Sequence, residues 1–253
     1  MSAAFVTGGS GLVGGALVAT LRGRGREVVA LARSPEAEAA LRTQGARPVR
    51  ADLFDPAALA RAMDGCATVF HVAGVNTLCP TDPSELVRVN VAGAEAVARA
   101  AATAGVKRLV HTSSAAAVGE RAGTIGREDS PHRGSYLSPY ERSKHEGERA
   151  VLAVAAREHL DVVCVNPASV QGPGRAGGTA RILLAAVDGR LPVFIETRIS
   201  LVDVADCVAG HLLAEERGRA GERYLLCGAT LTSREALALL ADVAGSTARP
   251  RIV

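Results

Sequence analysis

Residues 3–15 read AAFVTGGSGLVGG, a short apolar run that leads into a glycine-rich turn and an Ala/Leu/Val-rich stretch. The apolar run predicts a buried strand, and the stretch after the turn predicts a helix. Glycines at positions 8, 11 and 14 allow a tight turn, a close approach of the backbone to a pyrophosphate, and close packing of helix on strand. The start of the helix offers free N–H groups to phosphates. We therefore predict dinucleotide binding, against the alternative of a flexible surface loop.

Short Val/Leu-rich runs alternate with Ala-rich stretches along the chain, which is typical of a parallel sheet covered by helices on both faces. We expect strands near 3–7, 27–32, 48–51, 67–72, 107–112 and 161–166. We expect helices near 12–23, 35–44, 56–63, 84–104, 139–158, 178–188, 204–216 and 233–244. The alternation weakens after Asn166, where Gly and Pro become frequent. The sequence thus predicts an α/β fold: a doubly wound, Rossmann-type parallel sheet in residues 1–166 and a small, mainly substrate-binding lobe in residues 167–253, interleaved through a returning strand and helix.

The length and composition fit one enzyme-sized unit. The 253 residues carry a net charge of only +3, and the basic residues are dispersed, which argues against a nucleic-acid partner. No apolar run is long enough to span a membrane and the chain begins with a core strand, so we expect no membrane partner and a cytoplasmic location. The five cysteines and six histidines show no metal-ligand spacing, so we expect reduced thiols and no metal site. His145 is expected on a helix surface.

Tyr140 and Lys144 lie four residues apart at the start of a predicted helix. Residues at this spacing share a helix face, so an ammonium lies within reach of the phenol, lowers its pKa and makes it a usable general acid or base. The helix start is marked by Ser138 as N-cap, by Pro139 at the first position, and by Glu141, which would complete a capping box. Tyr140 is therefore expected in the first turn, near the open end of a cleft. The same spacing also occurs by chance on solvated helices.

The end of the second predicted strand indicates which cofactor is preferred. In this fold an acidic residue at that position binds the 2′-hydroxyl of NAD, but here the position holds Arg33. A guanidinium matches a 2′-phosphate in charge and geometry, so we predict NADP (NADPH) in preference to NAD, with an ordinary surface arginine as the alternative. Asp52 ends the third predicted strand, where its carboxylate either accepts a hydrogen bond from the adenine amino group or caps a turn.

Seven motifs in order make the chain resemble the extended short-chain dehydrogenases/reductases, also called the NAD-dependent epimerase/dehydratase family. They are TGGSGLVG at 7–14, Asp52-Leu53, HVAG at 71–74, NVAG at 90–93, TSS at 112–114, YERSK at 140–144 and Asn166-Pro167. The resemblance covers essentially the whole chain. Within the family, Arg33 and the segment NPAS at 166–169 are most similar to the dihydroflavonol-reductase branch.

The resemblance implies a role for individual residues. Tyr140 would give its proton to the carbonyl oxygen during reduction, and Lys144 would lower the pKa of Tyr140 and hydrogen-bond the nicotinamide ribose. Ser114 would hydrogen-bond the substrate oxygen, with Ser113 as the alternative. Asn90, grouped with these catalytic residues, would hold structure behind Lys144 rather than perform chemistry. The residues implied to bind the cofactor are Gly8, Gly9, Ser10, Gly11, Leu12, Val13, Arg33, Asp52, Leu53, Val72, Ala73, Gly74, Tyr140, Lys144, Pro167 and Ser169.

Three loops, residues 75–83, 119–137 and 169–175, are expected to line the substrate mouth, because ligands bind beyond the carboxyl ends of parallel strands. They hold no clear basic clamp for a nucleotide diphosphate, and Val118 stands where many sugar-processing relatives have a tyrosine. We therefore expect NADP-dependent reduction of a ketone or aldehyde on a small or largely apolar substrate. A nucleotide-sugar epimerase or dehydratase and a non-catalytic NADP sensor stay open as alternatives.

The resemblance also implies an assembly. Members of the family commonly form a homodimer through two helices, which here correspond to residues 84–104 and 139–158. Alanine-rich stretches in both helices permit close packing between subunits. The chain ends at Val253, earlier than the family pattern, so we expect the substrate lobe to be minimal, truncated or completed by another subunit.

Overall fold

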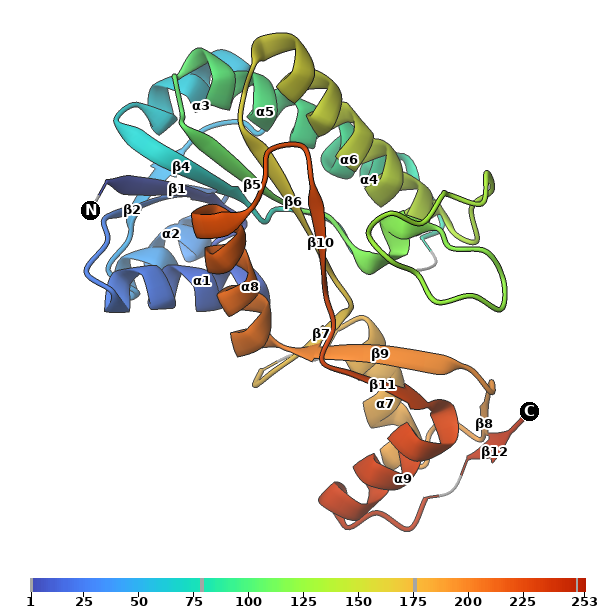
Figure 1. Cartoon of the computed structure of the whole chain (residues 1–253). Coiled ribbons are helices and arrows are strands. Elements are labelled where there is room, and N and C mark those ends of the chain that lie inside the picture. The colour runs from blue at the N-terminus through green and yellow to red at the C-terminus, as the bar shows by residue number, and fades with distance from the viewer. Residues whose placement is uncertain (1, 78–79, 175–176, 249) are drawn as a thin grey trace.

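Seven parallel strands form the central sheet of the computed structural model, which describes residues 2–77, 80–174, 177–248 and 250–253 (Figure 1). The strand order is β10-β6-β5-β4-β1-β2-β3. The bounds are Ala3–Thr7 (β1), Val28–Ala32 (β2), Arg47–Arg50 (β3), Cys66–His71 (β4), Arg108–Thr112 (β5), Val162–Pro167 (β6) and Arg223–Leu226 (β10). This confirms the predicted fold class. The strand ranges expected from the sequence did not include β10, which pairs with β6 in the register Arg223 to Cys164.

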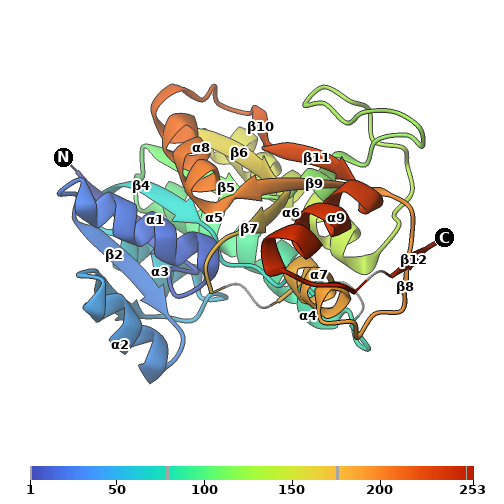
Figure 2. The same ribbon diagram turned by 90° about the horizontal axis from the view of Figure 1, so that it is seen from below.

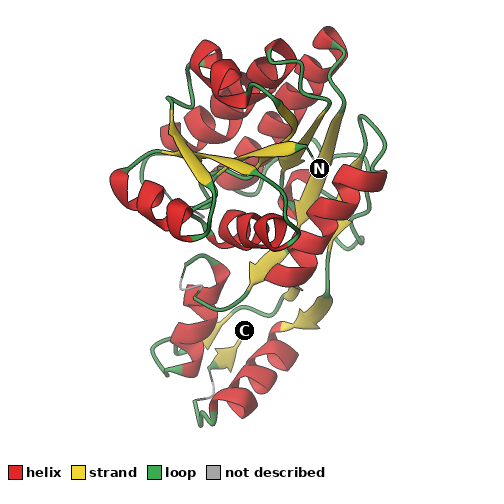
Figure 3. Cartoon of the chain, turned by 90° about the vertical axis from the view of Figure 1, so that its left-hand side faces the viewer, coloured by secondary structure: helices red, strands yellow, loops and turns green. Residues whose placement is uncertain are grey.

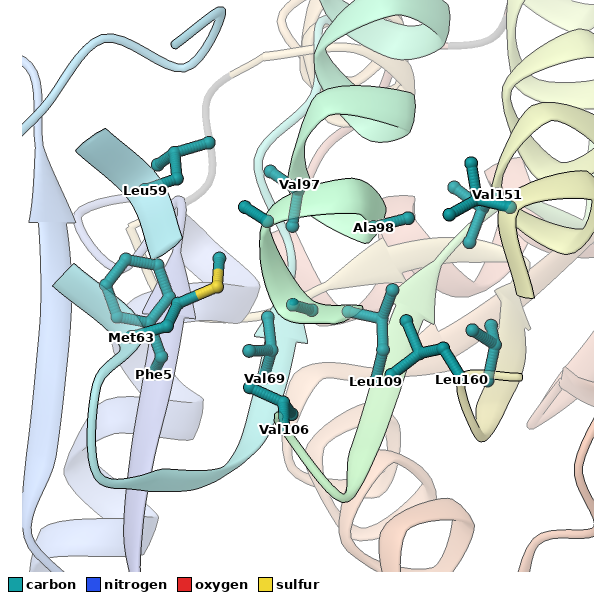
Figure 4. Packing of buried hydrophobic residues seen from close by; sticks show 14 of the residues in the cluster. Phe5, Leu59, Met63, Val69, Val97, Ala98, Val106, Leu109, Val151 and Leu160 are labelled. Atoms are coloured by element: carbon teal, nitrogen blue, oxygen red, sulfur yellow. The ribbon is translucent and has the colours of Figure 1, made fainter. Parts of the chain in front are cut away.

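Helices cover both faces of the sheet (Figures 1 and 3). Their bounds are Leu12–Gly23 (α1), Pro35–Thr43 (α2), Pro56–Met63 (α3), Ser84–Val87 (α4), Ala94–Thr103 (α5), Pro139–Glu158 (α6), Thr179–Val187 (α7), Val204–Arg217 (α8) and Ser233–Ala244 (α9). Helices α3, α5 and α6 lie on one face, and α1, α2 and α8 lie on the other. Successive residues of a strand point to opposite faces, so each central strand must be apolar on both. Phe5, Val69 and Leu109 thus pack under the first layer (Figure 4), and Val6 and Phe70 under the second.

The segment expected to form one helix over 84–104 is interrupted by a wider turn. Helix α4 runs into a π-helical turn at Arg88–Gly93, and α5 follows it directly. Helix α6 packs close to this turn because Gly147 has no side chain: a Cβ there would lie 2.0 Å from the main-chain oxygen of Asn90. The prediction of a uniform helix is wrong here, because apolar periodicity does not reveal one extra residue in a turn. Such turns are frequent at functional sites.

The smaller lobe lies beyond the carboxyl edge of the main sheet (Figures 2 and 3). Its strands are Ser169–Gln171 (β7), Val193–Phe194 (β8), Arg198–Asp203 (β9), Ala229–Thr232 (β11) and Arg251–Ile252 (β12), of which β11-β9-β7 form one sheet and β12-β8 another. Helices α7 and α9 pack against each other in this lobe. The intervening α8 and β10 return to the main sheet, so the two units are interleaved.

Cys66, Cys164 and Cys207 are buried free thiols, and Cys227 is an exposed one. Cys79 and Arg175, which fall in the expected substrate loops, lie outside the described residues. Within the described ranges, no helix is both long and apolar enough to cross a membrane.

Candidate active site

The glycine-rich turn between β1 and α1 packs tightly against the segment that follows β4. Gly8 has a φ of +69°, and a Cβ on it would lie 2.7 Å from the main-chain nitrogen of Ala73. A Cβ on Gly14 would lie 2.1 Å from the oxygen of Gly8, so both positions require glycine. Gly11 is the N-cap of α1, and no side chain caps the helix start. The first-turn N–H groups of α1 therefore suit the pyrophosphate of a dinucleotide, whose binding here stays a prediction.

The predicted adenosine end of the site lies after β2 and β3. Arg33 is exposed and forms no ion pair with the described residues, and Ser34 caps α2 by accepting a hydrogen bond from Ala37 N at 3.3 Å. Asp52 lies two residues beyond β3 and accepts a hydrogen bond from Phe54 N at 3.0 Å, so its side chain caps a turn. Its role at adenine stays a prediction. Leu53 packs against the π-helical turn: a Cβ added to Gly93 would lie only 2.8 Å from Leu53 Cδ2.

Lys144 points from α6 toward the carboxyl end of β5. Its Nζ donates a hydrogen bond to the main-chain oxygen of Thr112 at 2.8 Å, and the residue is only 8% exposed. Burial lowers the pKa of Lys144 to about 8, although the nearby Glu148 and Cys164 act in the opposite direction. A lysine with this pKa is charged at neutral pH and loses its charge under mildly alkaline conditions.

Tyr140 is half-buried in the first turn of α6. Ser138 caps the helix by accepting a hydrogen bond from Glu141 N at 3.1 Å, and Pro139 is the first helical residue. The reciprocal half of the predicted capping box is absent, because Glu141 turns its carboxylate away from the cap. One of its oxygens pairs with Arg133, and the other accepts a hydrogen bond from Leu137 N at 2.8 Å. A guanidinium is a stronger partner for a carboxylate than one backbone amide is.

Asn90 links the loop after β4 to helix α6. Its Oδ1 accepts from Val75 N at 2.8 Å, and its Nδ2 donates to Val75 O at 2.9 Å and to Ser143 Oγ at 3.0 Å. Ser143 Oγ in turn donates to the main-chain oxygen of Tyr140 at 2.8 Å. Gly74 lies beside this group, since a Cβ there would be 3.1 Å from Asn90 Oδ1 and 3.7 Å from Lys144 Nζ. Asn90 therefore holds structure between the predicted cofactor loop at 72–74 and the Tyr140 turn.

Ser114 and Ser113 differ in what their hydroxyls contact. Ser114 Oγ accepts a hydrogen bond from Ala116 N at 3.2 Å and caps the short 3-10 turn Ala115–Val118. This bond uses a lone pair of Ser114 and leaves its O–H proton able to serve another acceptor. Ser113 Oγ is buried and has no partner among the described residues. The geometry of Ser114 thus suits donation to a substrate oxygen.

Asn166, near the end of β6, supports the Ser114 backbone and is itself held by a buried carboxylate on α6. Asn166 Nδ2 donates to Ser114 O at 3.0 Å and to Glu148 Oε2 at 2.7 Å. Glu148 also pairs with Arg223 of β10 at 2.9 Å. Of the other residues implied to touch the cofactor, Pro167 is the last residue of β6, one position beyond the predicted strand end, and Ser169 Oγ accepts from Gln171 Nε2 at 2.9 Å.

Two histidine contacts near Lys144 were not foreseen from the sequence. The rings of His71 and His111 stack with centroids 5.2 Å apart, and Thr7 Oγ1 lies 2.7 Å from His71 Nδ1. Burial and the charge of Lys144 lower the pKa of His71 to about 3 and that of His111 well below its usual value, which keeps both rings neutral. Strand register brings these side chains together, and sequence alone does not show register.

His211 on α8 reaches the same strand end from the opposite face of the sheet. Its Nδ1 donates to Cys207 O at 2.7 Å, so the neutral ring has Nε2 free to accept from the Thr112 hydroxyl at 2.9 Å. The residue is fully buried, and burial lowers its pKa to about 4. Thr112 therefore connects His211, through its side chain, with Lys144, through its main-chain oxygen.

His145 was predicted to lie on the helix surface, but the structure places it partly under a loop. It is half-buried, and its Nδ1 lies 2.9 Å from Ala117 O. Its ring packs against His132 of the preceding loop with centroids 4.1 Å apart. The sequence shows that His145 follows Lys144 in the predicted helix. It does not show that a loop covers this side of the helix.

Comparison with known proteins identifies the class to which this fold and site belong. The profile of the "NAD dependent epimerase/dehydratase family" matches residues 4–227. The chain belongs to this family and is an NAD(P)-dependent oxidoreductase of the extended short-chain dehydrogenase/reductase type.

Named relatives agree with the predicted dihydroflavonol-reductase-like branch. The chain is 37% identical to a putative dihydroflavonol 4-reductase of Synechocystis, covering 95% of this chain and 72% of the relative. It is 34% identical to the 4-hydroxy-2-methyl-3-oxo-4-farnesyl-3,4-dihydroquinoline-1-oxide ketoreductase of Stigmatella aurantiaca, covering 95% and 73%. Among solved structures, a dTDP-glucose 4,6-dehydratase double mutant from Streptomyces venezuelae with NAD bound superposes with a TM-score of 0.85 at 26% identity, covering 99% and 84%.

Proposed function

We propose that the protein uses NADPH to reduce a ketone or aldehyde group of a small or largely apolar substrate to an alcohol. Bound at the glycine-rich turn, the cofactor supplies the hydride. Tyr140 supplies the proton to the carbonyl oxygen, and Ser114 donates a hydrogen bond to the same oxygen. Reductases and a ketoreductase among the relatives support this direction of reaction.

The observation that carries this proposal is the position of Lys144. It lies one turn after Tyr140 on α6, is buried, and is fixed by its hydrogen bond to Thr112 O at 2.8 Å. A fixed ammonium beside a phenol favours the phenolate and so makes proton transfer from Tyr140 easier. Ser114 lies two residues beyond Thr112, so the three side chains come from the carboxyl end of β5 and the start of α6.

The preference for NADPH rests on Arg33. Its guanidinium is exposed beyond the end of β2 and forms no ion pair with the described residues. A 2′-phosphate supplies the charge partner that the guanidinium lacks there. Glu36, in the first turn of α2, opposes this preference by its negative charge.

A nucleotide-sugar dehydratase or epimerase is the second candidate, favoured by the close superposition on the dTDP-glucose 4,6-dehydratase. In that case the cofactor is regenerated in each cycle, so turnover consumes no added NADPH. The two candidates therefore differ in net cofactor consumption.

The test is a panel of ketones, aldehydes and nucleotide sugars, assayed with NADPH and with NADH by loss of cofactor absorbance. We expect carbonyl-dependent NADPH consumption that Tyr140→Phe abolishes. Tyr224→Phe, whose hydroxyl accepts from Arg219 N at 3.0 Å, is the matched control and retains activity. Unchanged carbonyl reduction in Tyr140→Phe would overturn the proposed role. Product formation from a nucleotide sugar without NADPH loss would favour the second candidate.

A further inference from the structure

Glu141, the residue directly after Tyr140, is a buried carboxylate with both oxygens in use. It is 5% exposed, one oxygen pairs with Arg133 Nη2, and the other accepts from Leu137 N at 2.8 Å. A buried charge is costly unless it is paired and hydrogen-bonded, so this position is specified by its partners. Both partners belong to the loop 119–137, which precedes α6.

Arg133 joins the two ends of that loop. Its main-chain nitrogen donates to Gly119 O at 2.8 Å, and its Nη1 donates to Glu120 O at 3.1 Å. Its side chain is 15% exposed, so the ion pair with Glu141 is shielded from solvent. Gly119, Glu120, Arg133 and Glu141 thus form one cluster, which we term the loop clamp.

A second contact ties the same region to α6. His145 Nδ1 lies 2.9 Å from Ala117 O, within the 3-10 turn that Ser114 caps. The His132 ring lies between Gly119 and His145: a Cβ on Gly119 would be 2.2 Å from His132 Cδ2, and the two imidazole centroids are 4.1 Å apart. The short turn that begins at Ser114 is therefore attached to α6 on two sides.

We propose that Glu141 is a positioning residue, which through the loop clamp fixes the turn bearing Ser114 relative to the helix turn bearing Tyr140. The connection along the chain from Ser114 to Tyr140 passes through the whole loop 119–137. Through the clamp, Gly119 at the start of this loop is joined to α6 by contacts of only two further residues, Arg133 and Glu141. This inference rests on the proposed function, because it assigns the clamp to the two groups that would contact the substrate oxygen.

The physical consequence is on the rate rather than on cofactor affinity. The clamp includes Glu141, the direct neighbour of Tyr140 in α6, whereas the glycine-rich turn lies between β1 and α1. A displacement of about 1 Å between reacting groups lowers a rate by about 100-fold. Glu141→Gln keeps an oxygen for Leu137 N but removes the charge that holds Arg133. We therefore expect kcat to fall by at least about tenfold, with the Kd for NADPH unchanged.

The experiment compares the full chain with Glu141→Gln, Arg133→Met and the double variant. Glu146→Gln is the matched control, because it removes an exposed ion pair with Arg142 (2.7 Å) from the same helix. The readouts are kcat for the carbonyl substrate, NADPH affinity by fluorescence, and hydrogen exchange of segments 114–119 and 138–141. If the clamp acts as one unit, the double variant loses no more activity than the worse single variant.

We expect faster exchange in both segments and lower kcat for the two single variants, with normal NADPH affinity and a control like wild type. Wild-type exchange in both segments would overturn the proposal, as would faster exchange with kcat unchanged, which indicates a purely structural loop contact. Arg133→Lys, which keeps the charge, provides an intermediate if Arg133→Met folds poorly. Tyr140→Phe separates the two hypotheses: if it is inactive while Glu141→Gln is fully active, only the clamp fails, whereas full activity in Tyr140→Phe refutes the proposed function.

Discussion

The Nζ atom of Lys144 donates a hydrogen bond to the main-chain oxygen of Thr112, with 2.8 Å between the two atoms. Burial brings the pKa of Lys144 down to about 8, so its charge is lost as pH rises through that value. If the ammonium supports proton donation by Tyr140, kcat/KM for reduction declines above about pH 8. A pH–rate profile checks this expectation. A flat profile between about pH 7 and 9 contradicts it.

Thr112→Val is expected to destabilise the protein. In the wild-type protein the Thr112 hydroxyl donates to His211 Nε2 at 2.9 Å. Without this hydroxyl, the buried Nε2 has no partner. An unsatisfied buried polar group costs about 1–3 kcal/mol. Urea denaturation measures this loss, and Thr112→Ser, which keeps the hydroxyl, serves as control. Equal midpoints for Thr112→Val and wild type would show that the contact contributes nothing.

Acid is expected to weaken the fold partly through His211. Burial holds its pKa at about 4 in the folded protein, whereas the ordinary value for histidine is 6.5, so the unfolded chain binds more protons between these values. Stability therefore falls as pH drops through this window, by roughly 3 kcal/mol for this one group. His211→Gln should make the dependence of unfolding free energy on pH less steep. A pH dependence in His211→Gln as steep as that of wild type would show that this histidine does not carry the effect.

Gly14→Ala is expected to disrupt the dinucleotide turn. The added Cβ would lie 2.1 Å from Gly8 O, a contact that forces the backbone to move. On Gly15 the added Cβ would lie 3.4 Å from Gly9 O, which is ordinary contact. NADPH binding followed by fluorescence should be lost in Gly14→Ala and kept in Gly15→Ala. Equal affinities in the two variants would show that the turn tolerates the shift.

Arg33→Ala is expected to change cofactor preference. Removal of the guanidinium takes away the proposed partner of the 2′-phosphate, so affinity for NADPH falls by about tenfold or more while affinity for NADH stays the same. Titration with both cofactors measures this ratio. Arg217→Ala, an exposed arginine at the end of α8, is the control. An unchanged ratio would mean that Arg33 does not select the cofactor.

Local sequence signals predicted much of the framework. The glycine spacing at 8, 11 and 14 and the Ser138 cap are short-range features, and the structure shows both where they were expected. A returning strand was expected but its range was not predicted; it is β10, which has only four residues, none of them fully buried. The π-helical turn was missed because apolar periodicity does not reveal one extra residue in a turn.

The parts of the site that sequence could not show depend on contacts between distant segments. Thr112 and His211 are 99 residues apart, and Asn90 and Ser143 are 53 apart. For Glu141 the local rule was misleading, since the capping-box spacing is present but Arg133 competes for the carboxylate. Each of these side chains has its role because of a partner that the fold supplies.

The pairing of β10 with β6 has a consequence for any attempt to cut the chain in two. A fragment that stops at residue 166 lacks Arg223–Leu226, so the main-chain groups of β6 that normally pair with β10 would be open at the sheet edge. Open edges of this kind pair readily with other chains and promote aggregation. The same fragment would leave Glu148 buried without Arg223. The C-terminal residues are therefore part of what protects the nucleotide-binding half from aggregation.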